Sequence, residues 1–107
     1  MVITIDTGGT KTLLAGFSKD GKLLKSFEFQ TPKSQQKYLE IIEKVIKKEF
    51  SKQLKAGEIQ AISCAEPGII ENGAILWAKN LRWQNFNIKA ELLKIFPIIK
   101  ILVENDA

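Results

Sequence analysis

The chain has 107 residues, of which 45% are hydrophobic and 26% are charged, proportions that suit one globular domain and exclude a disordered or collagen-like chain. Its 16 Lys and Arg residues exceed its 12 Asp and Glu residues, which gives a net charge of +4. Only Arg82 is an arginine, the residue that most often reads base edges and phosphates, so the basic balance predicts no nucleic-acid partner.

The start of the chain predicts three strands joined by two tight turns. The apolar or β-branched runs cover residues 2–5, 13–17 and 23–29. The second turn contains Asp20-Gly21, a dipeptide typical of β-hairpins. Because strands joined by tight turns pair antiparallel, we expect an antiparallel meander here.

One long amphipathic helix is predicted over residues 35–56. Ser34, after the break at Thr31-Pro32, is a suitable N-cap, and Gly57 can end the helix. Apolar residues recur at helical spacing and form one stripe: Tyr38, Ile41, Ile42, Val45, Ile46, Phe50 and Leu54. Lysines and glutamates cover the other side, which predicts a solvated face rather than a nucleic-acid surface.

The second half of the chain predicts further strands and one short helix. We expect a buried strand, a hairpin with an Asn-Gly turn, an irregular segment, a helix ended by Pro97 and a last strand, over residues 59–64, 69–76, 80–87, 88–96 and 98–103. This order of elements predicts an α/β fold with a mixed sheet that begins with three antiparallel strands.

Rare and missing residue types limit the chemistry and the location. The chain has no His, so we expect no His-based catalytic dyad and no zinc site within it. The single cysteine, Cys64, lies in an apolar run, which suits a reducing cytoplasm. No apolar run is long enough to span a membrane, and Met1 leads straight into a strand. We therefore expect a cytoplasmic protein with no membrane partner and its native start at Met1.

The turn between the first two strands, residues 6–12, is the first candidate site. Gly8 and Gly9 let the backbone approach a ligand closely and point amide groups at it. Hydroxyl and ammonium donors follow at Thr10, Lys11 and Thr12. These groups suit a phosphate, and Asp6 could bind Mg²⁺ directly or through water. The alternative is an ordinary Gly-Gly hairpin turn, because neither a Walker A loop nor a dinucleotide fingerprint is present.

The end of the last strand, Glu104-Asn105-Asp106, is the second candidate site. Side chains at the carboxyl end of a buried strand lie where open α/β sheets bind ligands. Asp106 could accept the proton of a hydroxyl group, and Asn105 could hydrogen-bond the same alcohol. A strand-end turn or a helix cap is the simpler alternative.

A third candidate site combines two loops. Pro67-Gly68, preceded by Glu66, exposes backbone near the same edge of the sheet. Asn80 offers a polar contact, and Trp83 an aromatic wall, to a ligand. Alternatively, Trp83 fills the core and the segment is an ordinary loop.

Taken together, the candidate sites resemble the ROK family of repressors and sugar kinases, which includes bacterial glucokinases, fructokinases and N-acetylhexosamine kinases. The resemblance spans the whole chain and rests on residues 6–12, Pro67-Gly68, Gly73, Asn80-Leu81, Trp83 and residues 104–107. It implies an actin-like ATPase, or ribonuclease H-like, lobe. It also implies ATP-dependent phosphorylation of a hydroxyl group on a hexose or N-acetylhexosamine.

The resemblance implies roles for the matching residues. The ATP phosphates would be bound by the first turn, at Asp6, Gly8, Gly9, Thr10, Lys11 and Thr12. Asp106 would be the catalytic base, and the sugar would be bound by Gly68, Asn80, Asn105 and Asp106. Mg²⁺ would accompany ATP near Asp6, directly or through water.

The chain also departs from the family pattern. Glu66 stands where the family usually has a small or apolar residue, and Lys79 where proline is frequent, so the sugar stays open. Family members are about two domains long, and their second lobe carries the adenosine pocket and a zinc site. We therefore expect residues 1–107 to be the N-terminal lobe of a longer kinase. We expect this lobe to be zinc-free, inactive alone and able to self-associate through the face that meets the missing lobe.

Two other functions stay open. The chain could be the sugar-sensing lobe of a ROK transcriptional repressor, although such repressors carry a helix-turn-helix domain where Met1 stands here. It could also resemble the N-acetylglucosamine kinases and BadF-type actin-like ATPases, which fit residues 6–12 equally well. The stretch 80–83 and the spacing to residues 104–106 favour the ROK kinases.

Overall fold

The computed structural model describes residues 1–106, which form two sheets and a set of helices. The strands are β1 (Val2–Thr7), β2 (Lys11–Phe17), β3 (Leu23–Gln30), β4 (Ala61–Glu66), β5 (Ile69–Glu71), β6 (Ala74–Ala78), β7 (Trp83–Phe86) and β8 (Lys100–Asn105). The helices are α1 (Gln35–Glu49), α2 (Ser51–Lys55), the 3-10 helix η1 (Lys79–Leu81) and α3 (Ile88–Ile95). None of these helices is long and apolar enough to cross a membrane.

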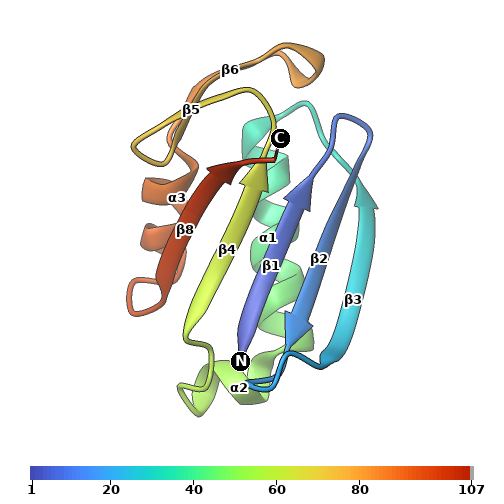
Figure 1. The fold of residues 1–107 in the computed structure, drawn as a ribbon, viewed down its shortest axis with the longest axis vertical. Helices are drawn as coiled ribbons and strands as arrows, with labels where there is room; N and C mark the ends of the chain where they lie inside the picture. Colours follow the sequence, from blue (N-terminus) through green and yellow to red (C-terminus); the bar gives the residue numbers. More distant parts are fainter. Residues whose placement is uncertain (107) are drawn as a thin grey trace.

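The larger sheet has the strand order β3-β2-β1-β4-β8 and is mixed. β1 pairs antiparallel with β2, and β2 with β3, which confirms the expected meander. On its other side β1 pairs parallel with β4, and β4 with β8. Because these three strands run in the same direction, their carboxyl ends meet at one edge of the sheet, the upper edge in Figure 1.

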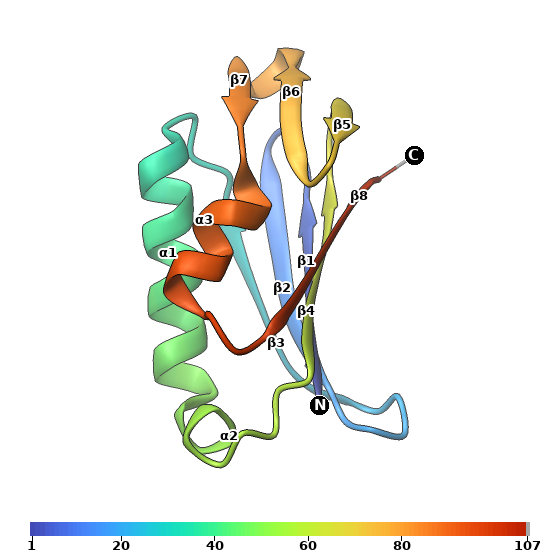
Figure 2. The same cartoon turned by 90° about the vertical axis from the view of Figure 1, so that its left-hand side faces the viewer.

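One face of the larger sheet carries the hydrophobic core. Both α1 and α3 lie on this face, to the left of the sheet in Figure 2. Tyr38, Ile42 and Ile46 form the buried stripe of α1, and they share the core with Ile3 and Ile5 of β1. The apolar stripe read from the helical spacing is therefore confirmed.

The single helix predicted over residues 35–56 is in fact two helices. Ser34 caps α1 as predicted, because its hydroxyl accepts an N–H of the first turn at 3.2 Å. The backbone leaves helical geometry at Phe50, with φ −121° and ψ 28°. The ring of Phe50 is buried and makes an edge contact with Phe27 of β3, with centroids 6.2 Å apart. The helical spacing of apolar residues does not predict this break, because the break coincides with the packing of the Phe50 ring against a distant strand.

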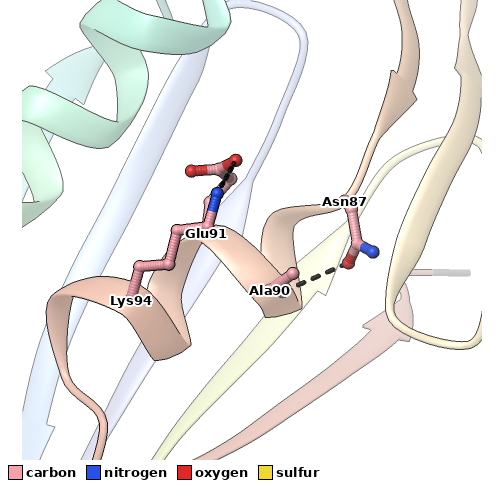
Figure 3. Close-up of polar contacts among 4 residues, drawn as sticks. All are labelled: Asn87, Ala90, Glu91 and Lys94. Carbon is pink, nitrogen blue, oxygen red and sulfur yellow. Dashed lines mark hydrogen bonds and ion pairs between the residues drawn. The ribbon is translucent and has the colours of Figure 1, made fainter.

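The short helix α3 begins at an asparagine cap, drawn in Figure 3. Asn87 Oδ1 accepts the N–H of Ala90 at 3.1 Å, and Lys94 Nζ lies 3.2 Å from Glu91 Oε1. A cap of this kind fixes the residue at which a helix begins, here directly after β7. The short helix expected before Pro97 is thus confirmed.

The prediction of an irregular segment over residues 80–87 is wrong. The segment contains the end of η1 and strand β7, which pairs antiparallel with β6, for example through Ile75 and Phe86. The hairpin expected over residues 69–76 is confirmed as β5 and β6, with Asn72-Gly73 in the left-handed region. Residues 83–86 form a strand because they pair with β6 and complete this small sheet. Strand formation here depends on pairing more than on local propensity.

Two parallel strands begin later than predicted. The strand expected over residues 59–64 is β4, and the one expected over residues 98–103 is β8. β4 begins where Ala61 faces Val2 of β1, and β8 begins where Lys100 faces Ala61. The pairing register, and not the start of the apolar run, therefore determines where both strands begin. Both strands also end two residues later than predicted, closer to the carboxyl edge of the sheet.

Candidate functional site

Three loops meet at the carboxyl edge of the larger sheet. They are the β1–β2 turn, the β4–β5 loop and the segment that ends β8, and they adjoin because β1, β4 and β8 are neighbours. Pairing sets Asp6 opposite Ala65, and Glu66 opposite Asn105. The three candidate sites read from the sequence therefore share one edge (Figure 1).

The glycine turn between β1 and β2 is closed by hydrogen bonds. The N–H of Gly8 donates to the carbonyl of Lys11 at 2.9 Å, and the Thr31 hydroxyl donates to the carbonyl of Gly8 at 2.9 Å. A Cβ on Gly8 would lie 2.9 Å from the Lys11 carbonyl oxygen, which is too close for a real side chain. Among residues 1–106, the amides of Gly9 and Thr10 have no hydrogen-bond acceptor. They can therefore donate to an anion.

A pocket of about 220 Å³ lies where this turn meets the other loops. Its lining comes from the turn, the β4–β5 loop and the end of β6: Gly9, Pro67, Gly68, Ala78, Lys79, Asn80 and Leu81. A Cβ on Gly9 would lie 3.3 Å from the Cβ of Asn80, so the two segments are in close contact. The structure thus brings the predicted phosphate turn and two of the predicted sugar-binding residues to one cavity.

The β4–β5 loop holds the end of β8 in place. Gly68 has φ +88°, and a Cβ there would lie 2.0 Å from the carbonyl oxygen of Trp77, so only glycine fits. Asn105 donates its side-chain amide to the carbonyl of Gly68. The N–H of Asp106 donates to the carbonyl of Glu66 at 3.0 Å. The last residue of β4 and the loop that follows it therefore position both the predicted sugar ligand and the predicted base.

Two residues read as ligand contacts are buried and have partners within the chain. Thr12 is fully buried, and its hydroxyl hydrogen-bonds that of Thr31 at 2.7 Å, so it does not reach a phosphate in this conformation. Trp83 is 1% exposed, donates its indole N–H to the carbonyl of Lys33 at 2.8 Å and packs edge-on against Tyr38. Burial keeps both side chains from ligand contact in this structure, which favours the core-filling alternative for Trp83 and leaves the phosphate role of Thr12 a prediction.

The charged side chains of the site face solvent. Asp6 and Asp106 are exposed, and Lys11 Nζ lies 3.5 Å from Glu28 Oε1 on β3. Within residues 1–106, no group of three or more His, Cys, Asp or Glu side chains is placed to enclose a metal ion. Mg²⁺ commonly takes one or two carboxylates and fills its remaining positions with phosphate oxygens and water. The exposed Asp6 beside the glycine turn fits that mode of binding.

A buried carboxyl group lies beside the site, and sequence reasoning did not find it. The Thr7 hydroxyl donates to Glu66 Oε2 at 2.6 Å, and the Tyr38 hydroxyl lies 3.2 Å from both carboxyl oxygens. All three side chains are 0% exposed. The only sequence signal was that Glu66 departs from the family pattern.

Burial sets the protonation of this group. Burial raises the pKa of Glu66 from 4.5 to about 8. Hydrogen bonds from Thr7 and Tyr38 lower this pKa, while the nearby carboxylates Asp106 and Asp6 raise it. Glu66 is therefore mostly protonated at neutral pH, which a buried carboxyl without a cationic partner requires.

Comparison with known proteins gives one family. The model of the ROK family matches residues 2–107. No curated protein sequence matches the chain.

Solved structures share the fold. A ROK family glucokinase from Streptomyces griseus, in complex with glucose and AMPPNP, has a TM-score of 0.80 at 22% identity, over 99% of this chain and 33% of that one. An inorganic polyphosphate/ATP-glucomannokinase from Arthrobacter sp. strain KM has a TM-score of 0.73 at 29% identity, over 99% and 44%. A ROK family transcriptional regulator, a homolog of the E. coli MLC protein, has a TM-score of 0.79 at 20% identity, over 98% and 27%. The chain thus spans less than half of each structure, and the expected α/β fold of an actin-like ATPase lobe is confirmed.

Proposed function

The chain belongs to the ROK family, and we propose that it is the N-terminal lobe of an ATP-dependent sugar kinase. The complete protein would phosphorylate a hydroxyl group of a hexose or N-acetylhexosamine. One observation carries this proposal: the glycine turn, Gly68, Asn80 and Asp106 come from distant parts of the chain and meet at the carboxyl edge of β1, β4 and β8. Open α/β sheets bind ligands at this edge.

Each group at this edge has a chemical task in phosphoryl transfer. Asp106 takes the proton of the attacking sugar hydroxyl, and Asn105 orients the sugar with Gly68 and Asn80. The free amides of Gly9 and Thr10 donate to the phosphates of ATP. Gly8 gives this turn its tight closure.

Two further side chains would act on the phosphates. Lys11 is exposed, and its ion pair with Glu28 is a surface pair that costs little to break, so its ammonium can turn to a phosphate. Asp6 would hold Mg²⁺, directly or through water. When bound, the ion neutralises the charge that develops on the transferred phosphoryl group.

The proposal includes a second lobe. The site residues of this chain lie on an open edge, and phosphoryl transfer requires a closed cleft that excludes water. We propose that the adenosine pocket and the remaining sugar contacts come from a C-terminal lobe in a cytoplasmic protein. The same exposed face would allow two copies to pair. Any zinc site of the complete protein would belong to the C-terminal lobe.

The test is a coupled ATP-consumption assay on the natural full-length protein with a panel of hexoses and N-acetylhexosamines. We expect turnover with at least one sugar, and no turnover by residues 1–107 alone. An intact mass of 12.0 kDa for the natural protein, together with no activity on any sugar, would contradict the proposal.

A second function is favoured by one observation. The TM-score of 0.79 with a ROK transcriptional regulator is close to that with the glucokinase. The lobe of such a regulator would bind sugar without transferring phosphate. Sugar binding by the full-length protein in the absence of ATP consumption, together with sugar-dependent DNA binding, would support this alternative.

A further inference from the structure

The buried network of Thr7, Tyr38 and Glu66 has no part in the chemistry described so far. The charged and titratable groups that face Glu66 are Asp6 on β1, Cys64 on β4, Tyr38 on α1 and Asp106 after β8. None of these is a cation, and no ion pair to Glu66 exists among residues 1–106. The contacts of the carboxyl group are therefore hydrogen bonds to hydroxyl groups, and it neutralises no cation.

The two ends of Glu66 hold different parts of the site. Its carboxyl group accepts a hydrogen bond from the hydroxyl of Thr7, the residue between Asp6 and Gly8 of the glycine turn. Its main-chain carbonyl accepts the N–H of Asp106 at 3.0 Å. One residue thus connects the predicted phosphate turn with the predicted base.

The network also ties this pair of contacts to a rigid element. The Tyr38 hydroxyl lies 2.7 Å from the Thr7 hydroxyl and 3.2 Å from the Glu66 carboxyl oxygens. Tyr38 belongs to the buried stripe of α1 and packs edge-on against Trp83, with ring centroids 4.8 Å apart. The three polar groups therefore form a closed set of contacts anchored in the core.

An apolar side chain would fill this space at lower cost in desolvation. We propose that Glu66 is a positioning residue of the phosphotransfer site, because its carboxyl group fixes the Thr7 end of the glycine turn to α1 while its main chain fixes Asp106. This inference rests on the proposed kinase function. It adds that the distance between phosphate turn and base is set by Glu66, at a position where the family resemblance leads one to expect a small or apolar residue.

Two substitutions separate positioning from simple packing. A protonated carboxyl both donates and accepts a hydrogen bond, and the amide of glutamine does the same. Glu66→Gln should therefore keep the network, whereas Glu66→Leu keeps the volume and removes the hydrogen bonds. Tyr38→Phe removes one contact and leaves the carboxyl group, and it serves if the Leu variant does not fold. Glu71→Gln on the exposed strand β5 is the matched control.

The first measurement is amide hydrogen exchange on residues 1–107. In Glu66→Leu we expect protection at the amides of Gly8 and Asp106 to fall at least about tenfold, since local opening controls exchange, while the amide of Phe50 keeps its protection. Glu66→Gln should stay within about threefold of wild type at all three amides. Unchanged protection at Gly8 and Asp106 in Glu66→Leu would overturn the proposal. A uniform loss at all three amides would overturn it as well, because it would make Glu66 a packing residue only.

The second measurement separates this inference from the proposed function. In a full-length protein with sugar kinase activity, Glu66→Leu should lower kcat about 10- to 100-fold, because small misplacement of reacting groups is costly. The KM for sugar should change little, Glu66→Gln should restore most of kcat, and Glu71→Gln should match wild type. If wild type has no activity, the kinase proposal fails, while the exchange measurement still decides whether Glu66 positions Asp106 and the turn. Equal kcat for wild type and Glu66→Leu would overturn the positioning role.

Discussion

Gly9 lies directly against Asn80, so that a Cβ added to Gly9 would be 3.3 Å from the Cβ of Asn80. One residue belongs to the turn after β1 and the other to the helix η1 after β6. Their contact forms one wall of the pocket at the carboxyl edge. A side chain at Gly9 would therefore enter the space that we assign to ligands.

The first prediction concerns this contact. Gly9→Val should raise the KM for ATP or sugar at least about tenfold, because the isopropyl group occupies the pocket and displaces Asn80. Gly9 has no positive φ and is exposed, so the thermal midpoint should change little. Steady-state kinetics and thermal unfolding of the full-length protein test both parts. A large loss of stability with unchanged KM would contradict the assignment.

The second prediction concerns the proposed base. Asp106→Asn should lower kcat of the full-length protein by about 10²- to 10⁴-fold, the usual contribution of a general base. Folding should be unaffected, because Asp106 is exposed and the bond from its N–H to Glu66 is made by the main chain. Asp20→Asn in the β2–β3 turn, at the other end of the sheet, is the control. Equal turnover in the two variants would remove Asp106 from the mechanism.

The third prediction compares two glycines with nearly the same positive φ. Gly68 has φ +88° and Gly21 has φ +85°, but an added Cβ would lie 2.0 Å from the Trp77 carbonyl at Gly68 and would meet nothing within 4 Å at Gly21. Gly21→Ala should cost about 1 kcal/mol, the conformational term alone. Gly68→Ala should cost about 3 kcal/mol or more, because the backbone must also shift. Urea denaturation of residues 1–107 measures both, and equal losses would contradict the close approach.

The fourth prediction concerns pH. The pKa of Glu66 is raised from 4.5 to about 8 in the folded chain, chiefly by burial. The unfolded chain therefore loses this proton at a lower pH than the folded chain does. The stabilising effect of the neutral carboxyl is complete below pH 4.5 and is lost as the pH rises to about 8. In this range the free energy of unfolding should fall by up to about 1.4 kcal/mol per pH unit.

The check is urea denaturation between pH 5 and pH 7.5, about the middle of this range. Glu66→Gln should flatten the dependence, whereas Glu71→Gln should leave it as in wild type. Burial raises the pKa of Cys64 above 9.0 and that of Tyr38 above 10.0, so neither group titrates in the range measured. A slope that Glu66→Gln does not change would show that another group causes it.

The fifth prediction concerns the two tryptophans. Trp83 is 1% exposed and Trp77 is 38% exposed. In Trp77→Phe the remaining emission from Trp83 should be blue-shifted and weakly quenched by acrylamide. In Trp83→Phe the remaining emission from Trp77 should be red-shifted and strongly quenched. Strong quenching of Trp83 would show that its ring is accessible to solvent, and would support the interpretation of Trp83 as an aromatic contact for a ligand.

Much of the local structure could be predicted from short-range chemistry. The turns at Asp20-Gly21 and Asn72-Gly73, the cap at Ser34 and the buried stripe of α1 all depend on residues close together in the sequence. Their backbone requirements act within a few residues, so these predictions were confirmed. The break at Phe50 was missed, because it coincides with packing against Phe27 on a distant strand.

The candidate site likewise has features that the sequence indicates and features that depend on tertiary packing. The sequence indicated the segments at Gly8, Gly68, Asn80 and Asp106, because glycine pairs and strand-end carboxylates have recognisable patterns. It could not indicate that Thr12 and Trp83 are buried, since burial depends on which elements pack against them. The buried state of Glu66 was missed for the same reason.

The turns, the helix caps, the buried stripe of α1 and the residue types available for phosphate and sugar chemistry follow from the sequence alone, because propensities, turns and caps act within a few residues. The tertiary structure alone decided where those residues lie. The parallel order of β1, β4 and β8 brings Asp6, Glu66 and Asn105 to one edge, and pairing makes a strand of residues 83–86. The packing of α1 on the sheet then encloses Glu66 with Thr7 and Tyr38 and removes it from water. Its raised pKa follows from that desolvation, a property of the surroundings and not of the residue.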